Sequence, residues 1–197
     1  MPYSAAHKQE TRARIIETAR CLFNRNGFES VSIDMIMEAS GLTRGGFYNH
    51  FKNKEALYCE AVESFLMGRG KVWRDEAGID PANLNAQMAQ QMITAYLSGE
   101  HLGDLEGQCP MIALPSDIAR AGAPVRTAYA GLLEAMTGLL SASLSAAEEP
   151  PTNPRETALS MAALCIGGMV IARTLPDSAL AEEVRTAALN MAMQTIA

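Results

Sequence analysis

The sequence is poor in aromatic residues, in charge and in cysteine. Aromatic residues make up 6% of the 197 residues and charged residues 19%. The four cysteines lie far apart and form no C-x-x-C pair, which excludes the spacings of zinc ribbons and thioredoxin-like sites. Nothing suggests a disulfide framework, so a reducing cytoplasm is the simplest setting. The first ten residues are polar, and we therefore expect no signal peptide.

Long apolar runs and catalytic clusters are also lacking. The most apolar segment, Ala158–Ala172, contains Ser160 and Gly167–Gly168 and is shorter than the ~18 residues of a membrane span. We expect it to be a buried helix and the chain to have no membrane partner. None of the three histidines lies beside a plausible nucleophile. The sequence therefore predicts no enzyme, no catalytic residue, no cofactor and no metal site.

The net charge of −6 argues against a nucleic-acid partner, but its distribution does not. Residues 1–55 carry eight Lys and Arg against six Asp and Glu, a net of +2. Residues 56–197 carry eight against sixteen, a net of −8. A slightly basic head on an acidic body permits DNA binding by the head alone.

Apolar periodicity and capping residues predict an all-α fold of about nine helices. Gly27 and Gly41 suit helix ends, with Phe28 folding back on Phe23, while Ser32, Thr43 and Asn53 suit helix starts. Asp80–Pro81 and Pro124 are strong start signals, and Pro115 cuts a helix that opens at Cys109–Pro110. Gly99–Gln108 is expected to be a loop containing His101. The last helices are expected at about Arg155–Thr174 and Ser178–Ile196.

The first 55 residues have the layout of a helix-turn-helix domain, followed by a helical body over residues 56–197. Three short helices, the last two joined by a glycine turn, can place one exposed helix in the major groove. In that helix Arg44 can bind a guanine edge and Asn49 an adenine edge. The full expected DNA-binding set is Thr43, Arg44, Gly45, Gly46, Tyr48, Asn49, His50 and Lys54. The arginines of the first helix are interpreted as a solvated face.

The string GLTRGGFYNHFKNKEAL, starting at Gly41, resembles the DNA-binding domain of TetR/AcrR transcriptional regulators. The resemblance covers residues ~8–65 closely and the remainder only in layout. It implies DNA contacts from the same set except Gly46, which departs from the family's usual Ala, Ser or Thr. Phe47 and Phe51 are implied to be core residues.

The family resemblance implies that the body binds a small molecule and dimerises. The two small-residue-rich terminal helices can form a four-helix interface across a twofold axis. An apolar effector pocket is expected, with Trp73 closing one end and Arg69 as a possible counter-charge. The residues expected to line it are Phe65, Met88, Met92, Tyr96, Met136, Met161 and Cys165. The competing interpretation of the methionine stripes is core packing alone.

The sequence thus predicts a homodimeric repressor that binds a palindromic operator in double-stranded DNA and is released by a small hydrophobic effector. Two alternatives remain open. One is a helical adaptor that binds proteins. The other is a regulator sensing oxidants or electrophiles through Cys109, at the start of a predicted helix.

Overall fold

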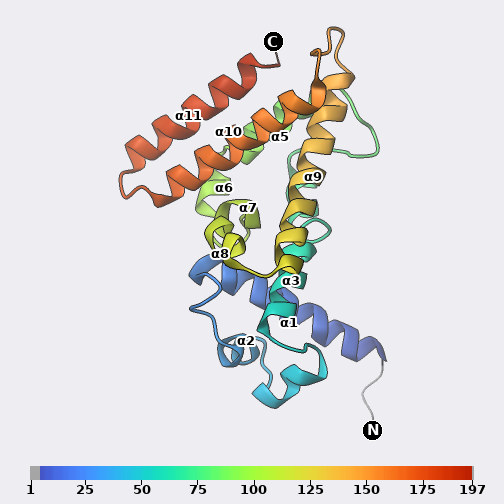
Figure 1. The fold of residues 1–197 in the computed structure, drawn as a ribbon, viewed down its shortest axis with the longest axis vertical. Helices are drawn as coiled ribbons and strands as arrows, with labels where there is room; N and C mark the ends of the chain where they lie inside the picture. Colours follow the sequence, from blue (N-terminus) through green and yellow to red (C-terminus); the bar gives the residue numbers. More distant parts are fainter. Residues whose placement is uncertain (1–4, 197) are drawn as a thin grey trace. The chain divides into compact units, whose positions relative to one another are not determined.

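The computed structural model describes residues 5–196 and is helical throughout that range (Figure 1). Eleven α-helices and one 3-10 helix are present among these residues, against about nine helices expected. The described residues contain no β-strand, in agreement with the all-α prediction. The chain divides into two compact units, each made of two separate stretches of sequence.

The first unit contains residues 1–67 and 105–129. Its N-terminal helices pack around a buried aromatic cluster, in which the ring centroids of Phe23 and Tyr58 lie 5.0 Å apart and those of Phe28 and Tyr58 lie 4.6 Å apart. The predicted return of Phe28 onto Phe23 is confirmed, with centroids 5.6 Å apart. The helices of this unit are α1 (Ala5–Asn26), α2 (Ile33–Ala39), η1 (Arg44–Asn49), α3 (Lys54–Ser64), α7 (Pro110–Ala113), α8 (Pro115–Arg120) and the start of α9 (Ala123–Ser145).

Local capping signals determine these helix ends. Gly27 and Gly41 have φ angles of +78° and +69°, as the sequence predicts, because residues with a Cβ rarely adopt this conformation. The side chain of Ser32 accepts a hydrogen bond from the backbone N–H of Met35, and that of Asn53 accepts one from Ala56. The predicted break at Pro115 separates α7 from α8.

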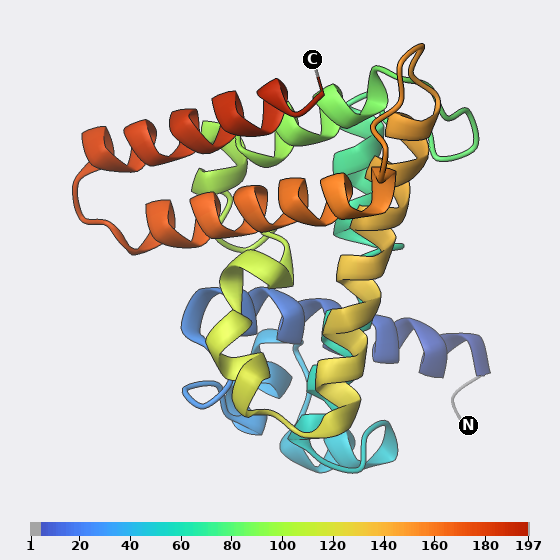
Figure 2. The ribbon, with the colours of Figure 1, turned by 45° about the horizontal axis from the view of Figure 1, so that its top comes forward.

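The second unit contains residues 68–104 and 130–197. Figure 2 shows α10 (Pro154–Thr174) and α11 (Ser178–Gln194) as an antiparallel pair, and α5 (Met88–Tyr96) packs against both. Both terminal helices lie within a residue or two of their predicted bounds. The remaining helices of the unit are α4 (Arg69–Glu76), α6 (Gly99–Gly103) and the rest of α9.

Several expectations for the second unit are wrong. Asp80–Pro81 does not start a helix: the Asp80 carboxylate accepts a hydrogen bond from Ala82 N in a turn, and α5 begins only at Met88. Leu84 is 45% exposed in the loop that precedes α5. The expected loop Gly99–Gln108 begins with α6, capped by Ser98. Residues 105–129 group with the N-terminal stretch in the first compact unit. The domain boundary after residue 55 stays a prediction.

Candidate nucleic-acid interface

The short helix η1 is anchored by its aromatic residues and exposes the rest of its surface. Phe47 is fully buried and Phe51, just after η1, is 4% exposed, as expected for core residues. Their ring centroids lie 5.6 Å apart, and the ring of Tyr48 lies edge-on to that of Phe47. Tyr48 itself is 60% exposed. The exposed members of the predicted DNA-binding set are Thr43, Arg44, Gly45, Tyr48 and Asn49, with Gly46 and His50 half-buried.

The expected helix over Arg44–His50 is a 3-10 helix. Its backbone bonds run from Gly46 N to Thr43 O at 3.0 Å and from His50 N to Phe47 O at 2.9 Å. Gly45 and Gly46 have low α-helical propensity, and a 3-10 turn suits so short a segment. The turn before it is fixed by a bond of 2.8 Å from Leu42 N to Met37 O, which closes α2 around Gly41. The two helical segments and this turn form a helix-turn-helix.

Arg44 has a protein partner in the structure. Its Nη1 lies 2.6 Å from Oδ2 of Asp34, which is in the first turn of α2, and both side chains are more than half exposed. An exposed ion pair of this kind contributes only about 0–1 kcal/mol. Arg44 can therefore leave Asp34 and bind a base edge or a phosphate at a small cost in free energy.

A family model supports the helix-turn-helix assignment. Residues 15–61 match the model for bacterial regulatory proteins of the tetR family. This match assigns the segment over residues 15–61, and not the whole chain, to the DNA-binding domain of the tetR family. The match contains α2, η1 and the turn between them, so the geometry described above is that of the family's DNA-binding domain.

Curated relatives match the same part of the chain. The HTH-type transcriptional regulator YfiR of Bacillus subtilis is 37% identical over 60 residues, which are 30% of this chain and 29% of YfiR. The HTH-type transcriptional regulator AcrR of Shigella flexneri is 46% identical over 55 residues, which are 28% of this chain and 26% of AcrR. The matched segments therefore span less than a third of either relative.

Several solved structures resemble the fold over almost the whole length of the chain. Escherichia coli NemR in its reduced form has a TM-score of 0.76 at 18% identity, covering 94% of this chain and 96% of NemR. A TetR transcriptional regulator from Chloroflexus aurantiacus has a TM-score of 0.67 at 26% identity, with the same coverage of both chains. The body of this chain thus shares its helical architecture with these proteins.

Lys54 is placed differently from the expectation of a phosphate contact. Its ammonium donates hydrogen bonds to the backbone oxygens of Phe28 at 2.8 Å and Val31 at 2.9 Å. It also lies 4.1 Å from the centroid of the Phe28 ring, a cation–π contact. Lys54 therefore fastens the start of α3 to the segment between α1 and α2, and the structure assigns it a structural role.

Replacing Lys54 by Met should reduce stability and leave the salt dependence of DNA binding unchanged. Two backbone oxygens lose a charged donor, which costs about 1.5–3 kcal/mol. Denaturant unfolding measures the loss. Lys52→Met is the matched control, because Lys52 is exposed and its loss should change stability by less than ~0.5 kcal/mol. A stable Lys54→Met variant with a reduced salt slope would restore the phosphate role.

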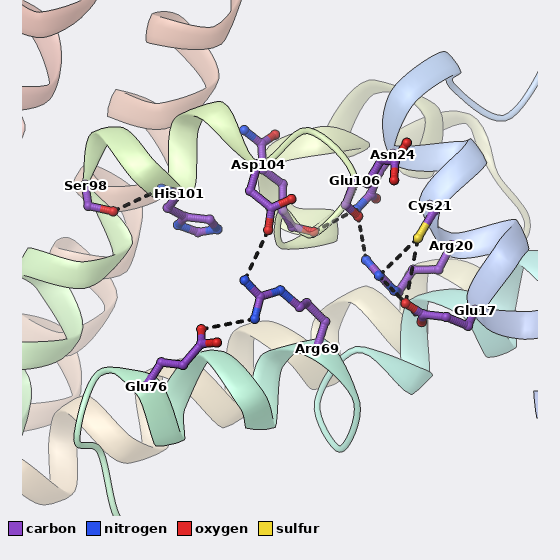
Figure 3. Close-up of polar contacts among 11 residues, drawn as sticks. Glu17, Arg20, Cys21, Asn24, Arg69, Glu76, Ser98, His101, Asp104 and Glu106 are labelled. Atoms are coloured by element: carbon purple, nitrogen blue, oxygen red, sulfur yellow. Dashed lines mark hydrogen bonds and ion pairs between the residues drawn. The ribbon is translucent and has the colours of Figure 1, made fainter.

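Arg20 is a buried residue that the sequence interpretation missed. It was assigned to a solvated face of α1, but it is 3% exposed. Figure 3 shows its guanidinium between the Glu17 carboxylate, at 2.6 and 2.8 Å, and the backbone oxygen of Glu106, at 2.7 Å. Asn24 donates to the backbone oxygens of Glu106 and Gln108. The only available sequence signal was Glu17 three residues before Arg20.

The residues expected to line an effector pocket are all buried. Phe65, the one member in the first unit, is 8% exposed. The six members in the second unit are at most 7% exposed. Burial raises the pKa of the Cys165 thiol to about 12. Burial is common to core packing and to a ligand cavity, so the pocket remains a prediction.

Two expectations for polar residues near this set are corrected. His101 lies in α6 at 7% exposure, with Nδ1 2.8 Å from the backbone oxygen of Tyr96 and its ring edge-on to the Tyr96 ring. Burial lowers the pKa of His101. Arg69 binds the carboxylates of Glu76 at 3.1 Å and Asp104 at 3.2 Å (Figure 3). An acidic effector would have to compete with both.

Cys109 is at the N-cap of α7, as predicted, and is 2% exposed. Because α7 has only four residues, its helix dipole is short. Reaction of this thiol with an oxidant or electrophile would require local opening of the first unit. The sensing role remains a prediction.

Proposed function

We propose that this chain is a cytoplasmic, homodimeric regulator of transcription that binds a palindromic DNA operator. The observation that carries the proposal is the exposed surface of η1 in a TetR family DNA-binding domain, supported from beneath by Phe47. One helix-turn-helix makes few base contacts, so a single copy binds weakly. Two copies related by a twofold axis can reach successive major grooves ~34–36 Å apart.

Exposed apolar side chains on the terminal helices support the dimer. Leu159 and Ile171 of α10 are 39% and 51% exposed, and Leu180 and Met191 of α11 are 44% and 51% exposed. Eleven residues are close to three full helical turns, so Leu180 and Met191 share one face of α11. Leu159 and Ile171 lie three steps of four residues apart, along one ridge that is inclined to the axis of α10. On α10 the intervening exposed or half-buried positions include Ala163 and Gly167, where small side chains allow close approach of a second helix.

The same face accounts for the apolar character of α10. Pro154–Thr174 is long and apolar enough to cross a membrane, with a mean hydropathy of 1.5 and 39% of the most apolar window buried. A subunit interface requires such a surface as well, since homodimer interfaces are more apolar than the rest of a protein surface. We therefore assign the exposed apolar positions of α10 to a second copy of the chain.

Effector release completes the proposal. The effector is a small hydrophobic molecule that binds best when the two N-terminal DNA-binding domains are spaced too differently from the operator half-sites to bind both. Its binding would therefore release the repressor from the operator DNA. The buried methionines and Tyr96 of the second unit support such a ligand, because thioethers adapt to irregular apolar shapes. Native mass spectrometry of the purified protein would identify a retained ligand by its mass.

DNA binding and dimerisation are tested on the full chain. Fluorescence anisotropy with a duplex from the chain's own upstream region measures specific affinity, and a duplex of random sequence measures the background. Sedimentation velocity gives the oligomeric state. A chain that prefers neither duplex, or that is a monomer at micromolar concentration, contradicts the proposal.

Replacing Arg44 by Ala should weaken binding to the specific duplex by about 1–3 kcal/mol and relax the preference at one base position. The physical reason is the loss of a bidentate pair with a guanine edge. Binding to the random duplex should change much less. Arg14→Ala, which removes an exposed arginine from α1, is the control. An Arg44→Ala variant with the parent's specific affinity would remove Arg44 from base reading.

A further inference from the structure

A hollow of about 260 Å³ lies in the first unit, where the segment between α1 and α2 meets the start of α3 and the turn between α8 and α9. The side chains that give it its chemistry are Phe28, Glu29, Glu55, Tyr58, Asp117 and Arg120. None of them belongs to the expected DNA-binding set or to the expected lining of the effector pocket. The hollow is therefore a separate candidate site.

The hollow is acidic. Glu29, Glu55 and Asp117 contribute three carboxylates and Arg120 one guanidinium, a net charge of −2. The Arg120 Nη2 lies 2.9 Å from Oδ1 of Asp117, so these two charges compensate each other. Among the described residues, neither Glu29 nor Glu55 has an ion-pair partner. Two carboxylates therefore remain for a cation to neutralise.

Backbone N–H groups hold two of the carboxylates in place. Glu55 Oε1 accepts a hydrogen bond from Gly122 N at 3.1 Å, and Asp117 Oδ2 accepts one from Phe28 N at 3.1 Å. The other oxygen of Glu55 accepts no hydrogen bond from the part of the chain that the structure describes. The Glu55 carboxylate is thus fixed in position with one oxygen available, which lowers the ordering cost of binding a ligand.

A buried phenol lies beside these carboxylates. Tyr58 is fully buried, and the described residues provide no hydrogen-bond partner for its hydroxyl. Burial raises the pKa of Tyr58, the Asp117 carboxylate raises that pKa further, and the Arg120 guanidinium lowers it. Because Asp117 and Arg120 both line the hollow, their effect places the hydroxyl on the hollow's side of the ring. A buried hydroxyl without a partner is costly, and an N–H donor in the hollow would provide one.

The lining indicates an organic cation and not a metal ion. No three His, Cys, Asp or Glu side chains among residues 5–196 are grouped so that they could hold a metal ion. The hollow is also smaller than the ~300–1,000 Å³ of sites for drug-sized ligands, so its ligand is small. Phe28 and Ala121 add apolar surface for an alkyl chain. A short aliphatic chain with two ammonium groups matches the size, the apolar surface and the charge of −2.

We propose that this hollow binds a small linear diamine. One ammonium group lies between the Tyr58 hydroxyl oxygen and the available oxygen of Glu55, and donates a hydrogen bond to each. The second ammonium pairs with Glu29 at the exposed rim, and the alkyl chain contacts Phe28 and Ala121. This site goes beyond the proposed function, because its ligand is cationic and polar whereas the proposed effector is hydrophobic.

Isothermal titration calorimetry on the full chain tests the charge of the ligand. Diaminobutane is the probe, butylamine carries a single ammonium, and butanediol carries none. Butylamine should bind about threefold more weakly than diaminobutane, because it lacks the ion pair with an exposed carboxylate. Butanediol should not bind. Because Glu55 and Asp117 each hold a neighbouring segment of the first unit, the Tm should also rise with the diaminobutane concentration.

Two variants test the position of the ligand. Tyr58→Phe removes only the hydroxyl and should weaken diaminobutane binding about tenfold. Without ligand it should unfold at the parent's temperature or higher, because an unpaired buried hydroxyl is gone. Glu29→Gln should weaken diaminobutane binding about threefold and leave butylamine binding unchanged. Glu38→Gln is the matched control: it makes the same charge change at an exposed position of α2 that does not line the hollow.

The outcomes that overturn the site are distinct from those that overturn the proposed function. A parent that binds no diaminobutane at millimolar concentration overturns the site, and so does butanediol binding as tightly as diaminobutane. Equal diaminobutane affinity in the parent, Tyr58→Phe and Glu29→Gln would place the bound amine elsewhere. Equal losses in Glu29→Gln and Glu38→Gln would assign binding to the general charge of the chain, and this comparison decides even if circular dichroism shows that Tyr58→Phe does not fold. None of these results bears on DNA binding, which is measured with the two duplexes.

Discussion

Replacing Ile171 by Glu should convert the protein into a monomer with a specific DNA affinity about 10²–10⁴-fold below that of the parent. Ile171 is 51% exposed on the face of α10 assigned to a second copy. A carboxylate buried there without a partner is strongly unfavourable. Each released protomer retains one helix-turn-helix and loses the avidity gained by linking two half-sites. Sedimentation velocity and anisotropy on the upstream duplex measure the two effects.

Val72→Glu is the matched control for this variant. Val72 is 48% exposed on α4, outside the terminal helices, and the substitution introduces the same charge. This control should remain dimeric and bind DNA as the parent does. Circular dichroism establishes that both variants fold. A dimeric Ile171→Glu protein with full affinity would place the subunit interface elsewhere.

Local signals explain why the N-terminal domain could be predicted from sequence. A glycine with positive φ and a side chain capping a helix are decided within a few residues, and Gly27, Gly41, Ser32 and Asn53 all behave as expected. The alternation of Phe47 and Phe51 with polar residues likewise fixes which side of η1 faces the core. Once the side of η1 with Phe47 and Phe51 faces the core, the predicted DNA-contacting side chains on its other side are exposed.

Residues whose partners are distant in sequence were not predictable in this way. Lys54 binds backbone oxygens 23 and 26 residues earlier in the chain, and Arg20 binds one 86 residues later. A basic residue next to a DNA-binding motif has the same sequence signature whether it contacts phosphate or protein. The failed start signal at Asp80–Pro81 has a local cause instead: the Asp80 carboxylate accepts a hydrogen bond from Ala82 N and stabilises a turn, which is a common alternative use of an aspartate.

Close packing of the terminal helices depends on one glycine. A Cβ atom at Gly168 of α10 would lie 2.8 Å from the Cβ of Ala188 on α11 and 3.3 Å from Cδ2 of Leu97. The first distance is shorter than real Cβ contacts, and the Ala188 Cβ cannot move without its backbone. Gly168 thus sets how closely α10 and α11 approach each other.

Replacing Gly168 by Val should therefore lower the free energy of unfolding by about 1–3 kcal/mol, because overpacking forces the two helices apart. Thermal unfolding at a fixed protomer concentration should show a Tm lower by about 2–4 °C for each kcal/mol. Gly138→Val on α9 is the control: a Cβ there meets nothing within 4 Å, and stability should change by less than ~0.5 kcal/mol. Equal effects at the two positions would show that helix propensity, and not the contact with Ala188, determines the response at Gly168.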